Sequence, residues 1–425
     1  DLYVPGYFEM NIKKGESIVF AASTSEIKTS TMKHLFDKEV DDRSPRDNFF
    51  HCLVNAAHQF HNSANKTERY LLAGYPWFKC RARDTFISLP GLTLSIDEQD
   101  YFELVMKTAE KGLREFMQNK PLTVKITEID QPDVMLWAIW AIQQYAKSAG
   151  DEKCISMYGK LISDIICYII DGKHPNLRLD TNGLLYANGH DKPITWMNSI
   201  VNGKPVVPRS GYIVEFNALW FNALKFGAKL AKQNNNETKA NQWEDLAESC
   251  KQSFVRTFLN DYGYLFDYVD GNMMDWSVRP NMIFPVAFDY SPLSPEQKKS
   301  VLDICTRELL TPKGLRSLSP KSGGYSPVCS GANRDYSYYQ GTAWPWLGGF
   351  YMEACLKLYK RTRLSFIERQ MVGYEDEMII NCLGTIPELF DGNPPFKARG
   401  AISYAMNVAE ILRTLNLLEK YSYVK

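Results

Sequence analysis

The segment VMLWAIWAIQQYA, residues 134–146, decides the fold class of this chain. Its apolar residues recur at the three- and four-residue spacing of a helix face, so the segment predicts a helix packed against other structure. Outward from it in both directions, the same period returns along almost the whole chain. It recurs at 49–60, 101–117, 154–170, 217–231, 243–259, 296–310, 342–359, 366–383 and 401–420.

Two shorter segments, near 84–94 and 280–288, complete this helical pattern. Together the segments make about a dozen helices, which follow one another as antiparallel pairs. A series of this kind predicts an all-α fold in which helical hairpins close into a toroid.

The first forty residues break the helical period. The strings YFEMNI (7–12) and KKGESIVFAAST (13–24) predict two short strands around a KKGE turn, and the charged residues 31–47 predict a connector to the first barrel helix. We therefore expect residues 1–40 to be the tail of an upstream β-domain with its linker. Residues 41–425 are expected to form the helical barrel.

Composition narrows the class of protein and of partner. With 425 residues, 45% of them hydrophobic, the chain can bury a large core. Lys plus Arg equals Asp plus Glu at 49 each, which gives no reason to expect a nucleic acid or an anionic membrane, so a neutral substrate fits better. No apolar run reaches the roughly 18 residues of a membrane span.

The cysteines and histidines predict neither a disulfide framework nor a metal site. The nine cysteines are scattered and never form a CxxC pair, which favours reduced thiols in a cytoplasmic protein. The six histidines never form an HExxH arrangement.

Long loops rich in aromatic residues, glycine and proline separate the predicted helices, and such loops are usually functional. In the loop 72–92, Trp77, Arg83 and Asp84 precede a helix. Asp84 could cap that helix and pair with Arg83, or the loop could bind sugar. The neighbouring aromatics favour sugar, because a flat ring covers the C–H face of a pyranose while charged groups bind its hydroxyls.

Three further loops combine aromatic, amide and charged side chains. Loop 193–220 holds Trp196, Asn198, Arg209, Glu215 and Asn217. In loop 267–284, Arg279 precedes a proline, and taken alone it is interpreted as a surface or structural arginine. Loop 314–346 contains Trp344 and is interpreted either as the rim of a pocket or as a packed Ω-type loop.

Loop 382–400 supplies a candidate general base. It places Glu388, Asp391 and Arg399 in a proline-punctuated segment between two helices. A carboxylate held beside aromatic and apolar neighbours is suited to accept a proton from water. The alternative is that Glu388 merely pairs with Arg399.

In chain order, nine strings of the sequence resemble the amylo-α-1,6-glucosidase domain of glycogen debranching enzymes. They are AGYPWF, RDTFISLPGL, LWAIWAIQQY, TWM, PRSGYIVEFNALWFNAL, RPN, GLRSLSP, QGTAWPW and PELFDGNPP. The resemblance runs from about residue 70 to the end of the chain. It implies an (α/α)6 barrel, inverting hydrolysis of α-1,6-linked glucose at the branch stubs of glycogen-like glucans, and no cofactor. It also implies a β-sandwich domain ahead of the barrel.

The resemblance implies a role for each matching site residue. Glu388 matches the general base of the family's PEL motif, and Asn198 stands where a TWMD motif ends in the acid aspartate. Where relatives read WGRD, this chain reads Arg81-Ala82-Arg83-Asp84. The other matching positions, expected to bind sugar, are Asp133, Arg209, Glu215, Asn217, Arg279, Trp344, Asp391 and Arg399.

Asn198 leaves three interpretations open. Loss of general acid catalysis costs about 10²–10⁴-fold in rate, so the chain could be an α-glucan-binding pseudoenzyme. Alternatively, Asp191 or Glu215 supplies the proton. In the third interpretation, the barrel acts on another glycoside, such as trehalose, a mannoside or a plain α-1,4 glucan. The retained sugar-binding positions favour an active or residually active hydrolase.

Overall fold

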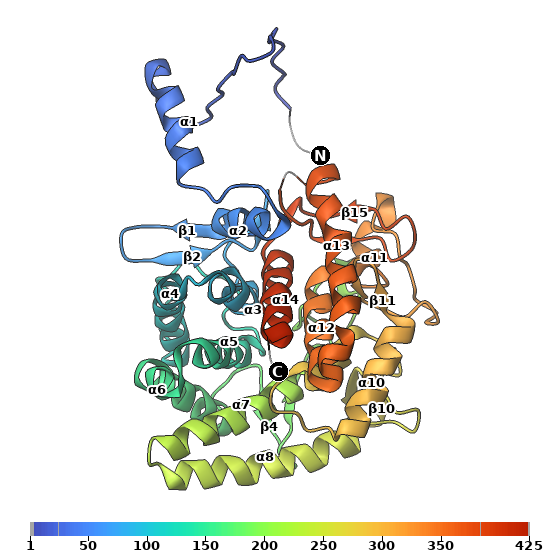
Figure 1. Cartoon of the computed structure of the whole chain (residues 1–425). Coiled ribbons are helices and arrows are strands. Elements are labelled where there is room, and N and C mark those ends of the chain that lie inside the picture. Colours follow the sequence, from blue (N-terminus) through green and yellow to red (C-terminus); the bar gives the residue numbers. More distant parts are fainter. Residues whose placement is uncertain (1–3, 24, 383, 424–425) are drawn as a thin grey trace.

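A computed structural model describes residues 4–23, 25–382 and 384–423, and its helices form two concentric rings (Figure 1). Within these residues, each helix of the inner ring contacts the next, and the last one returns to the first. The inner helices are α3 (Ala82–Leu92), α5 (Val134–Ala149), α7 (Val214–Gln233), α9 (Phe284–Ala287), α12 (Pro345–Tyr359) and α14 (Ala405–Tyr423). The ring is therefore closed.

The outer ring alternates with the inner one along the chain, and each outer helix packs on one or two inner helices. The outer helices are α2 (Phe49–Phe60), α4 (Gln99–Met117), α6 (Asp151–Ile170), α8 (Glu237–Phe258), α10 (Pro295–Glu308) and α13 (Leu364–Ile380). This alternation is the (α/α)6 barrel, so the predicted toroid of helical hairpins is confirmed. Short 3-10 segments lie between helices, at Leu94–Ile96, Pro280–Ile283, Gly331–Asn333 and Lys360–Arg363, beside the one-turn α11 (Arg334–Ser337).

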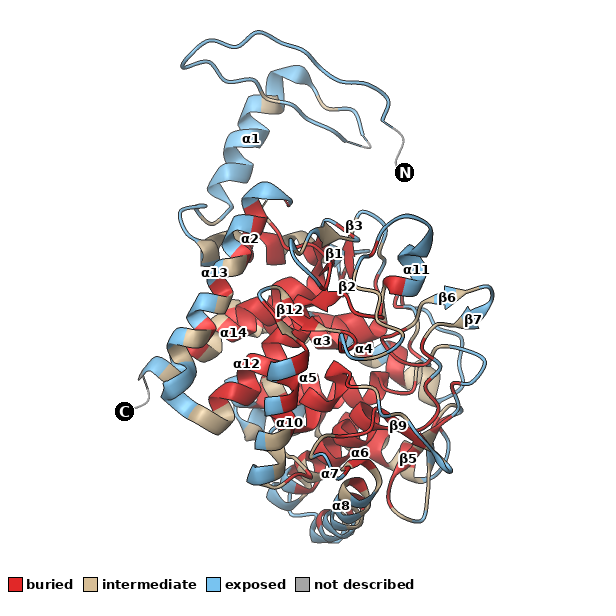
Figure 2. Ribbon diagram, turned by 90° about the vertical axis from the view of Figure 1, so that its right-hand side faces the viewer, coloured by how far each residue is buried: buried red, intermediate tan, exposed pale blue. Residues whose placement is uncertain are grey.

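Burial distinguishes the two rings (Figure 2). Every residue of α3 and of α9 is buried, whereas α4 buries one face that includes Phe102, Val105 and Met106. A helix that is apolar on all sides must be enclosed, and one with a single apolar stripe lies at the surface. The inner helices α3 and α9 are thus enclosed on all sides, whereas the outer helix α4 exposes one face to solvent.

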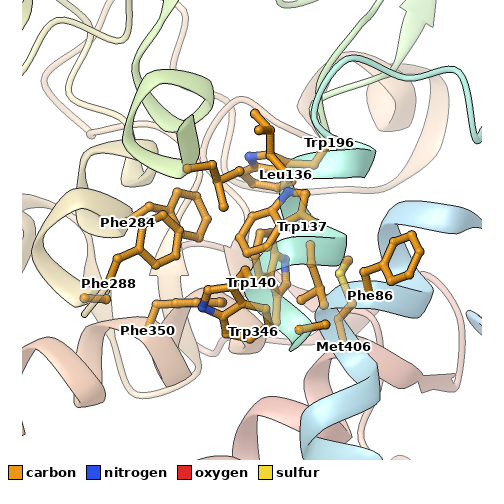
Figure 3. Close-up of a cluster of buried hydrophobic side chains, with 14 of the residues drawn as sticks. Phe86, Leu136, Trp137, Trp140, Trp196, Phe284, Phe288, Trp346, Phe350 and Met406 are labelled. Atoms are coloured by element: carbon orange, nitrogen blue, oxygen red, sulfur yellow. The ribbon is translucent and has the colours of Figure 1, made fainter. Parts of the chain in front are cut away.

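Aromatic side chains fill the middle of the barrel (Figure 3). Trp137 meets Phe284 edge to face at 5.5 Å between ring centroids, and Phe284 stacks on Trp346 at 5.8 Å. Phe350 packs against both Trp140 and Phe284. Because these rings contact one another and are buried, the middle of the barrel is a hydrophobic core, and a binding site is expected at one of its ends.

Short antiparallel strands lie where the chain enters several inner helices. The main ladders run β10-β9-β8-β5-β4 and β11-β12-β13-β14-β15, and β16 pairs with β3. In the first ladder the strands are Met273–Met274, Tyr268–Asp270, Gly211–Ile213, Leu185–Ala187 and Arg178–Leu179. In the second they are Leu310–Thr311, Gly314–Arg316, Ala343–Trp344, Leu389–Phe390 and Ala398–Arg399.

The remaining strands form three small pairs. They are β16 (Ser403–Tyr404) with β3 (Gly74–Tyr75), β1 (His61–Ser63) with β2 (Arg69–Leu71), and β6 (Ile200–Val201) with β7 (Lys204–Pro205). Strands β8, β13 and β16 run directly into α7, α12 and α14. The ladders therefore fix the loops around the N-terminal ends of the inner helices.

The N-terminal segment stands away from the barrel (Figures 1 and 2). The prediction of two strands is wrong for residues 4–23, which form no ladder, although the turn exists, with the Glu16 N–H donating to the Lys13 carbonyl at 3.0 Å. A hairpin without a third strand or a packed face has little stability of its own. The charged connector holds the helix α1 (Met32–Asp41). The upstream β-domain stays a prediction.

None of the helices in the described ranges combines the length and the apolarity required to cross a bilayer.

Candidate active site

Hydrogen bonds join the five predicted loops to one another at the N-terminal end of the inner ring. Each bond connects residues that are far apart in the chain. The loops therefore pack together and form one continuous surface. The bonds run from Arg83 to Ile194, from Tyr339 to Asn198, from Ser319 to Val278, from Gly392 to Pro327, and from Tyr404 to Asp84.

Glu388 is the buried carboxylate at the centre of this end. It precedes β14 and is 1% exposed. The Ala401 N–H donates to its Oε2 at 2.7 Å, and no hydrogen bond from the described residues reaches Oε1. Burial raises the pKa of Glu388 to about 8, with the Ala401 N–H lowering it and the Asp84 carboxylate raising it. One oxygen is therefore held and the other is left for a ligand.

Gly400 lies directly against the carboxylate of Glu388. Its φ is +71°, a region that favours glycine, and a Cβ built there would lie 2.2 Å from Glu388 Oε2. Only a residue without a side chain lets the turn close over the carboxylate.

Asp84 lies beside Glu388 and belongs to the first turn of α3. The Tyr404 hydroxyl donates to its Oδ1 at 3.0 Å. Burial raises the pKa of Asp84, while Arg81 and Arg83 lower it. The carboxylates of Asp84 and Glu388 thus lie close to the guanidinium groups of Arg81 and Arg83. Such an arrangement shifts pKa values and is typical of a functional site.

Asn198 faces the aromatic part of the same site. The Tyr339 hydroxyl donates to its Oδ1 at 2.9 Å. Tyr339 stacks on Trp344 with centroids 5.3 Å apart and an interplanar angle of 10°, and Trp196 meets both rings edge to face at 5.2 and 5.4 Å. Trp196 also lies edge to face against Trp346. We call Trp196, Tyr339, Trp344 and Trp346 the aromatic wall.

Trp77 takes a different position from these enclosed rings. It is 54% exposed, and its ring lies 6.2 Å from that of Phe78, which in turn contacts Tyr404 at 5.5 Å. An exposed indole offers an open face for the C–H side of a sugar.

A family model described as amylo-alpha-1,6-glucosidase matches residues 51–413. The chain belongs to this family of glycoside hydrolases. The glycogen debranching enzyme of Saccharomyces cerevisiae (strain ATCC 204508 / S288c) is 23% identical over 388 residues, which covers 67% of this chain and 25% of that protein. The chain thus spans a quarter of the length of this relative.

The fold also has a counterpart among solved structures. A bacterial glucoamylase complexed with acarbose aligns with a TM-score of 0.58 and 13% identity, over 93% of this chain and 60% of that chain. At this identity the likeness shows the fold, which agrees with that of a glycoside hydrolase.

Several residues that match motifs of the amylo-α-1,6-glucosidase family form buried ion pairs. Arg83 binds Asp133 with two hydrogen bonds of 2.7 and 2.8 Å, and the Trp137 indole N–H donates to the same carboxylate. Asp391 pairs in the same two-bonded way with Arg399 and accepts the Cys329 N–H. Since Arg399 is bound to Asp391, it is not the partner of Glu388.

A second buried network lies behind the aromatic wall. The Trp196 indole N–H donates to Asn281 at 2.7 Å, and the Asn281 amide donates to Asp267 at 2.7 Å. Asp267 and Glu215 both pair with Arg209. The network fixes the plane of Trp196, and both carboxylate oxygens of Glu215 are bound to Arg209.

Arg279 holds the backbone that carries Tyr339. Its Nη1 donates to the carbonyls of Ser317 and Tyr339 at 3.2 and 3.0 Å, and its Nη2 donates to the Gln340 side chain at 2.9 Å. Asn217 has a comparable role in the barrel, since its amide bonds the backbone of Leu185 on both sides. These two motif residues position the chain.

The two carboxylates considered as alternative proton donors lie in unlike surroundings. Asp191 is exposed on the loop before Trp196. Glu215 is 1% exposed and bound to Arg209.

Four residues of the site were not predicted from the sequence: Tyr339, Tyr404, Asp267 and Asn281. Tyr339 lies in the string YSYYQ and Asn281 follows Arg279 in RPN, so aromatic density and adjacency to a motif were the available signals. Asp267 and Tyr404 carry no local signal, because their roles depend on partners distant in the chain.

Proposed function

We propose that this barrel is an inverting glycosidase that releases glucose from α-1,6 branch stubs of glycogen-like glucans, with Glu388 as its general base. The observation that carries the proposal is the buried carboxylate of Glu388, which lies beside Asp84. The Ala401 N–H fixes one of its oxygens, and the other accepts no hydrogen bond from the residues that the structure describes. Membership of the amylo-α-1,6-glucosidase family supports the choice of reaction.

In an inverting mechanism, a base activates water on one face of the sugar while an acid protonates the leaving oxygen on the other. Glu388 in its ionised form would take the proton from water. Asp84 and the aromatic wall would bind the glucosyl ring, since carboxylates accept hydrogen bonds from hydroxyls and ring faces cover C–H groups.

The acid half of the reaction is weakened in this chain. The Asn198 amide can donate a hydrogen bond to the leaving oxygen, but it cannot transfer a proton. We therefore expect hydrolysis that is slower by about 10²–10⁴-fold than with a carboxylic acid at this position. The proposal is a residually active hydrolase.

The test is glucose release from a branched limit dextrin, compared with release from maltose, trehalose and a mannoside. We expect the dextrin to be preferred and Glu388→Gln to remove the activity while calorimetry shows unchanged binding of a branched oligosaccharide, because a base acts in the transition state. Glu237→Gln, on the exposed start of α8, is the matched control. Full activity in Glu388→Gln, or preference for another glycoside, contradicts the proposal.

A second candidate function is glucan binding without turnover. It is favoured by the arrangement around Asn198, whose Oδ1 is bound by the Tyr339 hydroxyl, while Asp191 is exposed and Glu215 is bound to Arg209. Oligosaccharide binding without hydrolysis of any of the four glycosides would select this candidate.

A further inference from the structure

We propose that Arg81 and Asn198 form a pair of hydrogen-bond donors for a leaving group that departs as an anion, so that the site cleaves α-glucosyl phosphate. The inference rests on the proposed function, because Glu388 activates water in both reactions. It goes further by naming a class of substrate that requires no acid from the protein.

Arg81 carries a charge that is available to a ligand. Its side chain is 20% exposed, its Nε donates to Glu128 Oε1 at 3.1 Å, and its guanidinium lies over the Phe78 ring at 5.5 Å. In the described residues, Nη1 and Nη2 make no hydrogen bond. A planar guanidinium with free terminal nitrogens matches the oxygens of a phosphate.

Glu128 sets the direction of this guanidinium. The backbone of Glu128 is held at φ +60°, and the adjacent Thr127 pairs with Arg81 as an isolated parallel bridge. Burial works to lower the pKa of Arg81, but Asp84, Tyr404 and Glu128 raise it, so the guanidinium stays charged. The Nε side of the Arg81 guanidinium is thus bound to Glu128, and within the described residues Nη1 and Nη2 remain available to a ligand.

Arg81 acts on both sides of the proposed reaction. It interacts electrostatically with Glu388 on the side of the base, and with Tyr339, whose hydroxyl binds Asn198, on the side of the leaving group. Its charge offsets part of the repulsion that Asp84 and Glu388 would exert on an incoming anion.

The Asn198 amide has a defined orientation. Because the Tyr339 hydroxyl donates to Oδ1, the amide carbonyl is turned to Tyr339. The two Nδ2 hydrogens have no hydrogen-bond acceptor in the described part of the chain. The amide is therefore a donor to the leaving group, of the kind that stabilises developing negative charge.

The reaction balances without an acid from the protein. Water attacks C1 of the α-glucosyl phosphate monoanion and gives one proton to Glu388. The C1–O bond breaks, and its electron pair stays on the phosphate oxygen. The products are β-glucose and hydrogen phosphate, which keeps the proton that the ester already carried, and Glu388 returns its proton to solvent. An ordinary glucoside would leave as an alkoxide and lacks such a proton.

The experiment compares two substrates whose leaving groups are both anions, α-glucosyl phosphate and α-glucosyl fluoride, by kcat/KM. We expect the protein to hydrolyse both, and inorganic phosphate to compete with both. In Arg81→Met, the phosphate-to-fluoride ratio of kcat/KM should fall about 10- to 100-fold, as expected for the loss of a charged hydrogen bond. Arg81→Lys should recover part of the ratio, because it restores the charge without the planar fork.

The control is Arg178→Met, which removes an arginine that is paired with Asp180 and 64% exposed at its side chain. Its phosphate-to-fluoride ratio should equal that of the parent. Hydrolysis of the fluoride without cleavage of the phosphate ester overturns the inference, whether or not phosphate inhibits, and leaves the proposed function standing. If neither substrate is hydrolysed, the proposed function fails and the inference fails with it. An unchanged ratio in Arg81→Met also overturns it.

Discussion

The hydroxyl of Tyr339 donates to Oδ1 of Asn198 at 2.9 Å, although the two residues are 141 positions apart in the chain. The contact connects Asn198, which we propose to stand at the position of the general acid, to the aromatic wall. It also fixes the amide orientation, because an amide oxygen accepts where its nitrogen cannot. Asn198 is thus held in a defined geometry that lacks only the proton.

We predict that Asn198→Asp raises glucose release from α-1,6 stubs by about 10²–10⁴-fold. The carboxyl is close in shape to the amide and lies among buried aromatic rings, where desolvation raises the pKa of an acid. A limit-dextrin assay measures the gain. Asn62→Asp, at an exposed position in β1, is the matched control and should leave the rate unchanged. No gain would show that Asn198 is not at the position of a missing acid.

We predict that hydrolysis of α-glucosyl fluoride increases with pH and levels off above about pH 8. Fluoride needs no protonation, so the profile reports the base, and burial raises the pKa of Glu388 to about 8. Below that pH the carboxyl is mostly protonated and unable to accept a proton from water. A profile of kcat/KM between pH 5 and about 9 tests this, and a rate that falls with pH would contradict it.

The same raised pKa couples stability to pH. A carboxyl that is easier to protonate in the folded state stabilises the fold at low pH, and this contribution is lost as pH rises through about 8. Glu388→Gln should therefore be more stable than the parent at alkaline pH, by up to a few kcal/mol. Equal unfolding midpoints of the two proteins at high pH would contradict the raised pKa.

Gly400→Ala should impair catalysis as well as folding. The added Cβ would lie 2.2 Å from Glu388 Oε2, and the backbone φ of +71° disfavours alanine. We expect a loss of about 1–3 kcal/mol in the free energy of unfolding and a fall of at least tenfold in kcat. Both are measurable by denaturant unfolding and by the fluoride assay.

The matched control is Gly172→Ala, where φ is +66° and nothing lies within 4 Å of a Cβ. It reproduces the backbone strain without the contact, so its kcat should match that of the parent. A similar fall in kcat in both variants would show that strain, and not displacement of Glu388, is the cause.

Arg83→Met should destabilise the barrel by about 3–5 kcal/mol, because it leaves the Asp133 carboxylate buried without its cation. Denaturant unfolding measures the loss, and Arg178→Met, which removes an exposed pair, should cost less than about 1 kcal/mol. A small loss in Arg83→Met, with weaker sugar binding, would instead assign Arg83 to the substrate.

The helices and their order could be read from the sequence. The period at 49–60 predicts α2 with the same bounds, and the segment 134–146 lies within α5. These features are local. A helix repeats every 3.6 residues, so about 15 consecutive residues are enough to show its apolar face. The strands predicted in residues 4–23 failed for the converse reason, since a strand requires partners.

The tertiary structure decided which residues pair. From the sequence, Arg399 was considered as a partner of Glu388, and Arg83 as a partner of Asp84. The fold joins Arg399 to Asp391, and Arg83 to Asp133, 50 positions away. A charged group binds whichever partner closes its hydrogen bonds after burial, and that depends on how the rings close. The sequence therefore identified the candidate residues, and only the closed barrel decided that one Glu388 oxygen accepts no hydrogen bond within the described ranges.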